Sequence, residues 1–331
     1  QAAQAAQAAR DAMPASEAWT AYVAERTAHW GERHARDHEV LARPGGDPAR
    51  RGTRGRGVTV AGPLHPLLAL PLKSLDTAAI EAWAQREGQH RPTSARLAWR
   101  LLRAFLSWCA EHSDYKTIVP AQNPAKSRRA REALGKAGVK SDALLKEQLP
   151  AWFAAVHALP AAPAAYLQTL LLTGARPGEL LGLRWDDMNV QWRGLTIRDK
   201  VEGERVIPLT PYVHHLLAGL PRRGRYVFST TDKPLSYPQR QHGKACTVAG
   251  VEGLTLHGLR RSFKSLSEWL ELPVGVIAQI QGHKPSATAE KHYTVRPLDL
   301  LRLHHERFEA WILEQAGVKC DASDAPGKLR A

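Results

Sequence analysis

Sulfur is scarce in this sequence, whose 331 residues include three cysteines and two methionines. The cysteines, Cys109, Cys246 and Cys320, lie far apart and form no CxxC pair. This spacing argues against a cysteine-bound metal and favours a reducing compartment, so we expect a cytoplasmic protein. The sequence shows neither a metal-ligand cluster nor a motif for a thiol nucleophile, and we expect no cofactor.

Long apolar runs are missing as well. Without a stretch of 18 apolar residues no membrane span is expected, and no secretory signal is visible. Hydrophobic residues still make up 44% of the chain, which is enough to form hydrophobic cores. Positive charge is abundant, because 46 Lys and Arg against 32 Asp and Glu give a net charge of +14. Such a charge attracts polyanions, although a plain basic surface would carry it too.

The first part of the chain is predicted to be helical. An Ala- and Gln-rich segment, 1–13, precedes a unit over 14–138 in which apolar residues recur at helical spacing, as they do over 16–42. Within this unit the stretch 43–57 holds five arginines among glycines and prolines. It cannot build a core and is predicted to be a flexible loop, either a clamp on a phosphate backbone or a solvated insertion.

Two further helices are expected in this unit. Ser74 offers a capping side chain for the first. Pro92 begins the second, on which Arg96, Arg100 and Arg103 lie four and three residues apart and therefore share one face. A basic face opposite an apolar stripe suits a helix that rests on DNA, and a plain solvated face would have the same pattern.

The second unit, 141–317, is followed by a tail over 318–331 and mixes helices with two strands. The strands are predicted over 195–199 and 205–209, with the Gly-containing KVEGE between them as a hairpin turn. Helices are predicted over 146–158, 163–173, 211–220, 237–249, 257–270, 274–281, 285–293 and 299–316. The expected fold is therefore mainly α with a small antiparallel β-sheet, in the α+β class.

Four segments of the second unit carry side chains that suit one chemistry. They are TGARPGEL with Arg176, RDKVEGERVIPL with Lys200, LHGLRRSF with His257 and Arg260, and IQGHKPSATAEKHYT with His283 and Tyr293. Cleaving a phosphodiester without a metal requires cations on the phosphate, a nucleophile in line and a proton donor for the leaving alkoxide. Arginine forks suit the phosphate oxygens, and a phenol becomes a nucleophile where cations stabilise its phenolate.

Arg176 is predicted to lie on a tight corner. Gly174 frees the backbone at the end of one helix, and Pro177 suits the first turn of the next. The helix N-terminus at this corner favours anions, and Glu179 is placed to orient the guanidinium. A surface corner with an ordinary salt bridge would share this pattern.

The remaining members of the set also have ordinary interpretations. His257 and Arg260 are three residues apart and share a helix face, which is common on a basic helix. Lys200 in the hairpin turn can deliver a proton to a leaving oxygen, or it can be solvated. Alternatives for contacting the phosphate lie on the flanking strands, at Arg198 and Arg205.

The order of these residues is more specific than any one of them. The series Arg–Lys–His–x–x–Arg–His–Tyr is formed by Arg176, Lys200, His257, Arg260, His283 and Tyr293. With TGARPGEL and GH…HYT it closely resembles the catalytic domain of the tyrosine recombinase (phage integrase) family over about 142–316. The helical unit before it resembles, more loosely, the core-binding domain of that family.

The resemblance implies a mechanism. Tyr293 would attack the scissile phosphate to form a 3′-phosphotyrosine, and Lys200 would protonate the leaving 5′ hydroxyl. Arg176 and Arg260 would clamp the non-bridging oxygens. Supporting roles would fall to His257 in proton transfer at the nucleophile, to His283 in a hydrogen bond to the phosphate, and to Glu179. Rejoining would need neither ATP nor a metal.

The implied partner is double-stranded DNA. In the family four protomers assemble on two duplexes, and the C-terminal segment often docks onto a neighbour; helix 299–316 is apolar enough for that role or for packing on its own domain. The enzyme would integrate or excise a mobile element in a bacterial cytosol or nucleoid. Contacts with DNA are expected from Arg50, Arg51, Arg54, Arg56, Arg96, Arg100, Arg103, Arg198 and Arg205.

Two features depart from the family pattern. His283 and Tyr293 are ten residues apart where many relatives have nine, so we expect a local adjustment of helix or loop. Only 13 residues precede the first long helix. Many integrases carry an arm-binding module there; it was either lost or trimmed, or this is a simpler recombinase.

Other functions stay open. A type IB topoisomerase-like nicking-closing enzyme shares the phosphotyrosine chemistry but exchanges no strands between duplexes. A DNA-binding protein derived from an integrase would lack catalysis, and the complete set of reactive residues argues against it. An RNA-binding protein is disfavoured because no stacking-aromatic motif for single strands is present.

Overall fold

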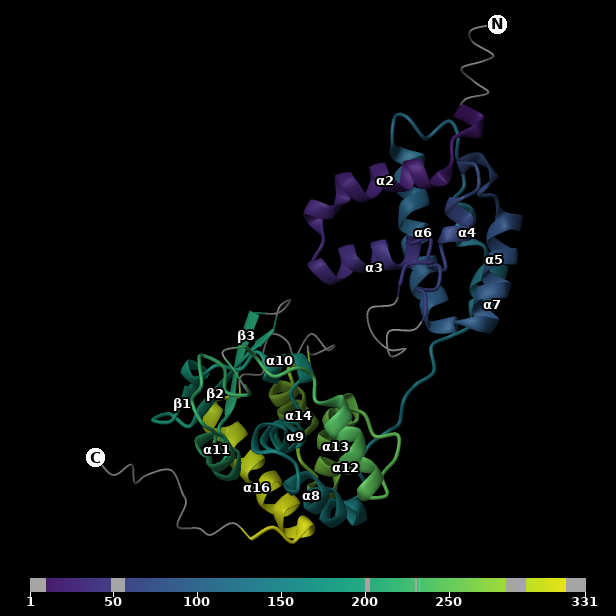
Figure 1. Cartoon of the computed structure of the whole chain (residues 1–331). Helices are drawn as coiled ribbons and strands as arrows, with labels where there is room; N and C mark the ends of the chain where they lie inside the picture. Colours follow the sequence, from purple (N-terminus) through teal and green to yellow (C-terminus); the bar gives the residue numbers. More distant parts are fainter. Residues whose placement is uncertain are drawn as a thin grey trace, which may run out of the picture. The chain divides into compact units, whose positions relative to one another are not determined.

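The computed structural model describes residues 10–48, 57–199, 203–229, 231, 233–283 and 296–319. The chain forms two compact units, Gln1–Val139 and Lys140–Ala331 (Figure 1). Residues 135–141, where the first unit gives way to the second, are exposed and carry no helix or strand. None of the described helices is long and apolar enough to cross a bilayer.

Helices build the first unit. They are α2 (Ala15–Arg26), α3 (Glu32–Ala42), α4 (His65–Leu68), α5 (Thr77–His90), α6 (Pro92–Glu111) and α7 (Arg128–Leu134), with short 3-10 turns at Thr27–His29, Leu72–Ser74 and Pro124–Lys126. Fully buried Trp83 and Phe105 lie at the centre of their shared core. The apolar stripe predicted on α6 is thus the face that the unit buries, with Leu102 beside Phe105.

The helical pattern over 16–42 is divided into α2 and α3. The backbone tightens to a 3-10 turn after Arg26 and becomes extended at Trp30, before α3 starts behind Gly31. The reversal lets His38 of α3 contact Trp19 of α2, with ring centroids 5.5 Å apart, and stack on Trp30 at 3.9 Å. Burial of these rings against each other favours the bend over one long helix.

The start of α5 differs from the sequence prediction. Ser74 lies in the preceding 3-10 turn, and Asp76 is the N-cap residue, whose carboxylate accepts a hydrogen bond of 2.8 Å from the amide of Ala79. The start of α6 at Pro92 agrees with the prediction. Asp at the N-cap of α5 and Pro at the first position of α6 are both ordinary preferences for helix N-termini. The N-cap of α5 lies two residues after the predicted one.

The second unit places a small sheet beside a helical bundle. Its helices are α8 (Leu149–His157), α9 (Ala161–Thr173), α10 (Pro177–Leu181), α11 (Pro211–Ala218), α12 (Gln239–Val248), α13 (Leu256–Ser267), α14 (Val274–Gln281) and α16 (Leu298–Ala316), with 3-10 turns at Lys146–Gln148, Trp185–Asp187 and Glu268–Leu270. The helix predicted over 285–293 lies outside the described residues.

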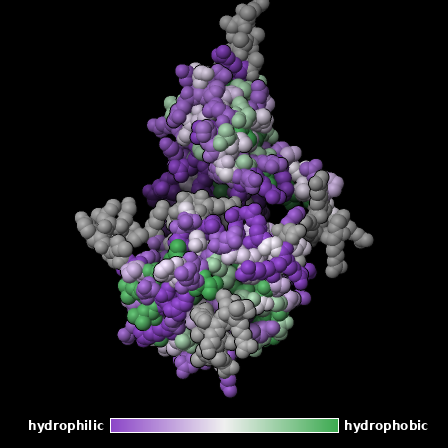
Figure 2. Space-filling model, turned by 90° about the vertical axis from the view of Figure 1, so that its left-hand side faces the viewer, coloured by the Kyte–Doolittle hydropathy of each residue, from purple (hydrophilic) through white to green (hydrophobic). Residues whose placement is uncertain are grey.

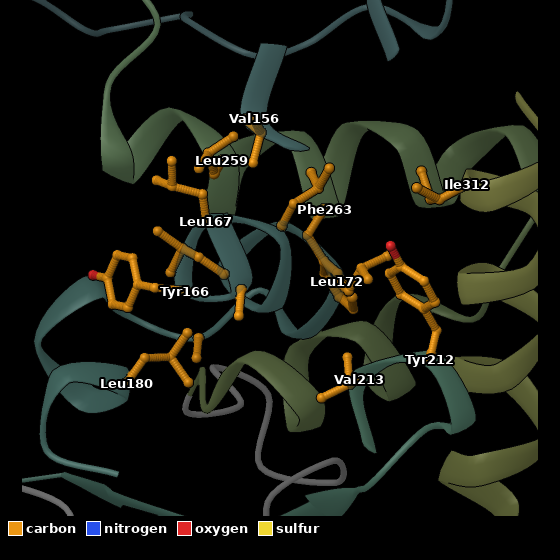
Figure 3. Close-up of a cluster of buried hydrophobic side chains, with 14 of the residues drawn as sticks. Val156, Tyr166, Leu167, Leu172, Leu180, Tyr212, Val213, Leu259, Phe263 and Ile312 are labelled. Carbon is orange, nitrogen blue, oxygen red and sulfur yellow. The ribbon is translucent and has the colours of Figure 1, made fainter. Parts of the chain in front are cut away.

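Helix α9 runs through the middle of this unit. Every residue from Pro163 to Thr173 is buried, including the polar Gln168, Thr169 and Thr173. Figure 3 shows Leu167 and Leu172 of α9 surrounded by side chains of other elements, among them Leu259 and Phe263 of α13. Helix α13 is therefore fixed against the centre of the unit, and with it the residues on its opposite face.

The sheet has three antiparallel strands in the order β1 (Met188–Asn189), β2 (Gly194–Asp199) and β3 (Gly203–Pro208). β2 and β3 form the predicted hairpin, with Ile197 opposite Arg205 and Thr196 opposite Val206. β1 has two residues and was not expected, because so short a strand has no pattern of its own. The predicted fold class, mainly α with a small antiparallel sheet, is confirmed.

The surface drawn in Figure 2 is mostly hydrophilic, with hydrophobic residues gathered in places on the Lys140–Ala331 unit. Exposed apolar side chains of this unit include Trp192 before β2, Val206 on β3 and Leu303 on α16. The other side of α16 is buried, with Leu301, Phe308 and Ile312 in the core of its own unit.

Candidate active site

Arg176 lies at the corner between α9 and α10. Helix α9 ends at Gly174, which has a φ of 58° and leaves no room for a side chain, because a Cβ would lie 2.7 Å from the ring of Phe263. Pro177 is the first residue of α10, so Arg176 becomes its N-cap with an extended backbone. The sequence pattern Gly–x–Arg–Pro thus produces the predicted tight turn.

Glu179 holds Arg176 at two points. One carboxylate oxygen accepts the backbone amide of Arg176 at 2.8 Å, and the other accepts its Nη1 at 2.8 Å. The same carboxylate receives both Nη atoms of Arg205, at 3.1 and 2.8 Å. Burial alone would raise the pKa of Glu179, but the hydrogen bonds from Arg205 and Arg176 outweigh it and lower the pKa. Glu179 is therefore an ionised anchor for the guanidinium.

Arg260 of α13 is held by carbonyl oxygens instead of a carboxylate. Its Nη1 donates to the carbonyl of Gly174 at 2.6 Å and to that of Gln281 at 2.9 Å. Its Nη2 lies 2.8 Å from Nε2 of His283. The side chain of Gln281 adds a bond of 2.9 Å to the Arg260 carbonyl. Arg260 thus ties the end of α9 to the end of α14, and it is nearly buried.

His283 follows the C-terminus of α14, where Gly282 adopts a left-handed backbone with a φ of 70°. Since Nε2 accepts from Arg260, the ring is neutral with its proton on Nδ1. Burial lowers the pKa of His283, and the charges of Arg260 and Arg176 lower it further. The histidine therefore stays uncharged near neutral pH and can donate one hydrogen bond.

His257 lies on the first turn of α13 and its side chain is exposed. Thr255 caps the helix, accepting the amide of Gly258 at 3.0 Å. Although the residue is exposed to solvent, partial desolvation of the ring by its neighbours lowers the pKa of His257, as do the charges of Arg261 and Arg260. The ring is therefore neutral near neutral pH and able to accept a proton. His257 and Arg260 are three residues apart on α13 and therefore lie on one face of the helix.

The N-terminus of α13 is fastened to the start of the second unit through Asp142. Its carboxylate accepts the amide of Thr255 at 2.9 Å and the Thr255 hydroxyl at 2.6 Å, and it pairs with Arg261. Burial would raise the pKa of Asp142, but these hydrogen bonds lower it overall. The approach is so close that a Cβ on Gly258 would lie 2.6 Å from the carboxylate.

Among the sequence-predicted residues, the structure brings Arg176, Arg260 and His283 together. The link is direct, because Nη2 of Arg176 also lies 3.5 Å from the carbonyl of Gly282, next to His283. Lys200 and Tyr293 lie outside the described residues. The cluster sets two guanidinium groups beside a neutral histidine, which suits an oxyanion with developing negative charge.

The predicted DNA-contacting arginines of the first unit have different environments. Arg100 is exposed, whereas Arg96 donates to the carbonyl of Leu134 at 3.1 Å and Arg103 stacks over Trp99 at 4.8 Å. Four arginines of the stretch 43–57 lie outside the described residues, namely Arg50, Arg51, Arg54 and Arg56. The shared face of α6 is therefore partly used for contacts inside the unit.

On the sheet, Arg198 and Arg205 also differ. Arg198 is exposed and pairs with Asp187, and its Nε lies 3.9 Å from Glu204. The side chain of Arg205 is only 17% exposed and is directed at Glu179. These two arginines of one strand pair thus have opposite surroundings, which their shared residue type did not indicate.

Two residues of the site were missed by sequence reasoning. Gln281 is buried and links Arg260 to the end of α14, and a polar residue at the end of the mainly apolar run VIAQIQ was the available signal. Asp142 had no signal, because its partners Thr255 and Arg261 are more than 110 positions away in the sequence. No group of metal-binding geometry occurs among the described His, Cys, Asp and Glu side chains.

Two guanidinium groups beside a neutral histidine are suited to holding a phosphate ester. The chain matches the phage integrase core-binding domain over residues 14–132 and the phage integrase family over residues 142–297. It is 45% identical over 323 residues to prophage integrase IntF of Escherichia coli (strain K12). The match covers 92% of this chain and 68% of that protein. The chain belongs to the phage integrase family, and the predicted activity of a tyrosine-type site-specific DNA recombinase is confirmed.

Solved structures share the fold. A lambda integrase fragment, a dimer bound to a COC′ core site, has 17% identity and a TM-score of 0.63, with 86% of this chain and 99% of that chain covered. A lambda integrase tetramer bound to a Holliday junction has 16% identity and a TM-score of 0.63, with 87% of this chain and 81% of that chain covered. The Tn1549 transposon integrase with circular intermediate DNA has 15% identity and a TM-score of 0.59, covering 89% and 100%.

Proposed function

We propose that this recombinase cleaves and rejoins double-stranded DNA through a 3′-phosphotyrosine formed by Tyr293. The observation that carries the proposal is the convergence of Arg176 and Arg260 with His283 on one spot. Two fixed guanidiniums can neutralise the charge that develops on the non-bridging oxygens as the phenol attacks. Each fixed donor contributes on the order of 2–4 kcal/mol in the transition state.

The two histidines take complementary parts in this proposal. His257 accepts the phenol proton of Tyr293, for which its lowered pKa leaves the ring unprotonated. His283 donates its Nδ1 proton to a phosphate oxygen, because Nε2 is already engaged with Arg260. Glu179 holds Arg176 in place without touching the DNA.

Lys200 is the proposed general acid for the leaving 5′ hydroxyl. In the sequence Lys200 follows Asp199, the last residue of β2, and precedes Gly203, the first residue of β3, and the same strand pair brings Arg205 to Glu179. A hairpin tip can reach the leaving oxygen once DNA is bound, and an ammonium there supplies the proton that the departing alkoxide needs. Rejoining reverses these steps, since the phosphotyrosine bond keeps the energy of the phosphodiester.

We also propose that four protomers act on two duplexes and exchange C-terminal segments. The solved relatives include dimers on a core site and a tetramer on a Holliday junction, which supports the proposal by analogy. Leu300 and Leu303 of α16 and the nearby Trp192 offer exposed apolar surface for a neighbour. The reaction would integrate or excise a mobile element in the cytosol or nucleoid of a bacterium.

A nicked suicide substrate carrying the recombination site tests the function. Wild-type protein is expected to form a covalent adduct, and Tyr293→Phe is expected to bind the same DNA with unchanged affinity and to form none. An adduct that persists in the variant would refute the assignment of the nucleophile. Relaxation of supercoiled DNA without joined products from two sites would instead indicate a nicking-closing enzyme.

A further inference from the structure

Arg205 lies on β3 between two exposed neighbours but is directed inward. The side chain of Glu204 is 65% exposed and Val206 is 50% exposed, against 17% for the side chain of Arg205. Adjacent strand residues point to opposite faces, so Arg205 is on the face that meets the body of the unit. An inward arginine must find partners for its donors.

Each of the three nitrogen atoms of the Arg205 guanidinium donates a hydrogen bond. Nη1 and Nη2 donate to the two oxygens of Glu179 at 3.1 and 2.8 Å, and Nε donates to the carbonyl of Ile280 at 3.1 Å. This is the two-pronged geometry that a planar fork provides and an ammonium does not. The group is thus committed to contacts inside the protein.

The partners of Arg205 are the two segments that carry the phosphate-binding residues. Glu179 uses the same two oxygens for the amide and the Nη1 of Arg176. At the other end, a Cβ on Gly282 would lie 2.8 Å from Cζ of Arg205, so the guanidinium packs directly under the residue before His283. A third connection is covalent, because β3 begins three residues after Lys200 in the sequence.

We propose that Arg205 is a positioning residue for strand cleavage and makes no contact with DNA. It keeps the carboxylate of Glu179 oriented toward Arg176, and it docks the hairpin that carries Lys200 against the end of α14. The inference rests on the proposed function, since its readout is the rate of phosphotyrosine formation. It replaces the expectation that Arg205 binds a backbone phosphate.

Two measurements on Arg205→Gln separate positioning from DNA contact. The single-turnover rate of adduct formation is expected to fall by about 100-fold, because a misplacement of about 1 Å at a reacting centre has an effect of that order. The slope of log affinity against log salt is expected to stay that of the wild type, whereas loss of a phosphate contact lowers it by about one. Arg205→Lys should also be slow, since one ammonium cannot serve both oxygens and the carbonyl.

The matched control is Arg302→Gln. Arg302 of α16 is similarly shielded, with 14% of its side chain exposed; it pairs with one carboxylate, that of Asp299, and donates to the carbonyl of Trp192 at 2.7 Å. Its loss is expected to leave the rate within about twofold of wild type. A comparable loss of rate in Arg302→Gln would mean general destabilisation and would overturn the inference.

A double-mutant cycle tests the route of the effect. If Arg205 acts through Glu179, the double variant Glu179→Gln, Arg205→Gln should form the adduct no more slowly than the slower of the two single variants. A double variant whose loss of rate is the product of the two single losses would show that Arg205 does not act through Glu179. A wild-type rate in Arg205→Gln, or a salt slope reduced by about one, would overturn the positioning role alone. A wild-type protein that forms no adduct would refute the proposed function and the inference with it.

Discussion

Arg176 and Arg260 carry the same guanidinium but are held by different partners. Arg176 shares the carboxylate of Glu179 with Arg205, so one negative charge faces two positive ones. Arg260 is held by the carbonyl dipoles of Gly174 and Gln281. Both arrangements fix the fork before substrate arrives, and the site keeps a net positive charge for the phosphate.

The shape of the fork at position 176 is the basis of one prediction. Arg176→Lys keeps the charge but loses the planar pair of donors, so we expect adduct formation to slow by about 10²–10³-fold. DNA affinity should change little, since it is dominated by many backbone contacts. Single-turnover kinetics and equilibrium binding on the same substrate measure both quantities. A variant with wild-type kinetics would show that charge alone is sufficient at this position.

The pH dependence of cleavage follows from His257. A base must be unprotonated to act, and the pKa of His257 is lowered by partial desolvation of its ring and by the charges of Arg261 and Arg260. The cleavage rate is therefore expected to stay level as the pH falls from about 8 through about 6.5, the ordinary pKa of histidine, and to decline only below it. A decline that is already half complete at about pH 6.5, and absent in His257→Gln, would show that the pKa of His257 is not lowered and would contradict this prediction.

Among elements, α16 and α11 are joined by a buried carboxylate. Glu309 of α16 accepts the amides of Tyr212 and Val213 at 2.8 and 3.1 Å and the hydroxyl of Thr210, which together form the N-terminus of α11. Burial raises the pKa of Glu309 to about 7 despite these bonds. The two helices thus share a capping group that titrates close to neutral pH.

The sign of the resulting pH effect is definite. The folded pKa of Glu309 is raised from 4.5 to about 7, so its contribution to stability is complete below pH 4.5 and is lost as the pH rises through about 7. In Glu309→Gln this loss disappears, so between about pH 4.5 and 7 the variant should gain on the wild type by up to about 1.4 kcal/mol per pH unit, and above about pH 7 the difference should level off. Urea unfolding at several pH values measures it; parallel curves for the two proteins would refute it.

Element by element, local signals decided what the sequence could predict. The corner at Gly174 and Pro177 and the hairpin of β2 and β3 follow from turn chemistry that a few residues contain. The break near Gly31 and the cap at Asp76 were missed, because ring packing and the preceding 3-10 turn depend on distant residues. β1 was missed because two residues form a strand only beside a formed hairpin.

The site shows the same limit. The residue types and their order indicated Arg176, Arg260 and His283 correctly as neighbours in space. The direction in which Arg205 points could not be predicted, since it is set by the packing of β3 on α10 and α14. A side chain's partner is a property of the assembled unit, whereas its chemistry can be read from the sequence.

At the scale of the whole molecule, the charge of +14 makes DNA binding sensitive to salt. If the complex neutralises about 6–10 phosphates, affinity should fall by about 10³–10⁵ between about 50 and 200 mM salt, because bound counterions are released. Fluorescence anisotropy with a labelled duplex at four salt concentrations gives the slope. Binding that hardly changes over this range would mean that few arginines and lysines contact the backbone.

The anchoring of Asp142 to the start of α13 has a geometric consequence. Because Asp142 is fastened to Thr255 and Arg261, the free connection between the units comprises the seven residues from Gly135 to Ser141. Seven residues span at most about 25 Å when fully extended. At about 3.4 Å per base pair, that length corresponds to about seven base pairs of a duplex. On DNA, the end of α7 and the start of the second unit can therefore be no more than about that number of base pairs apart.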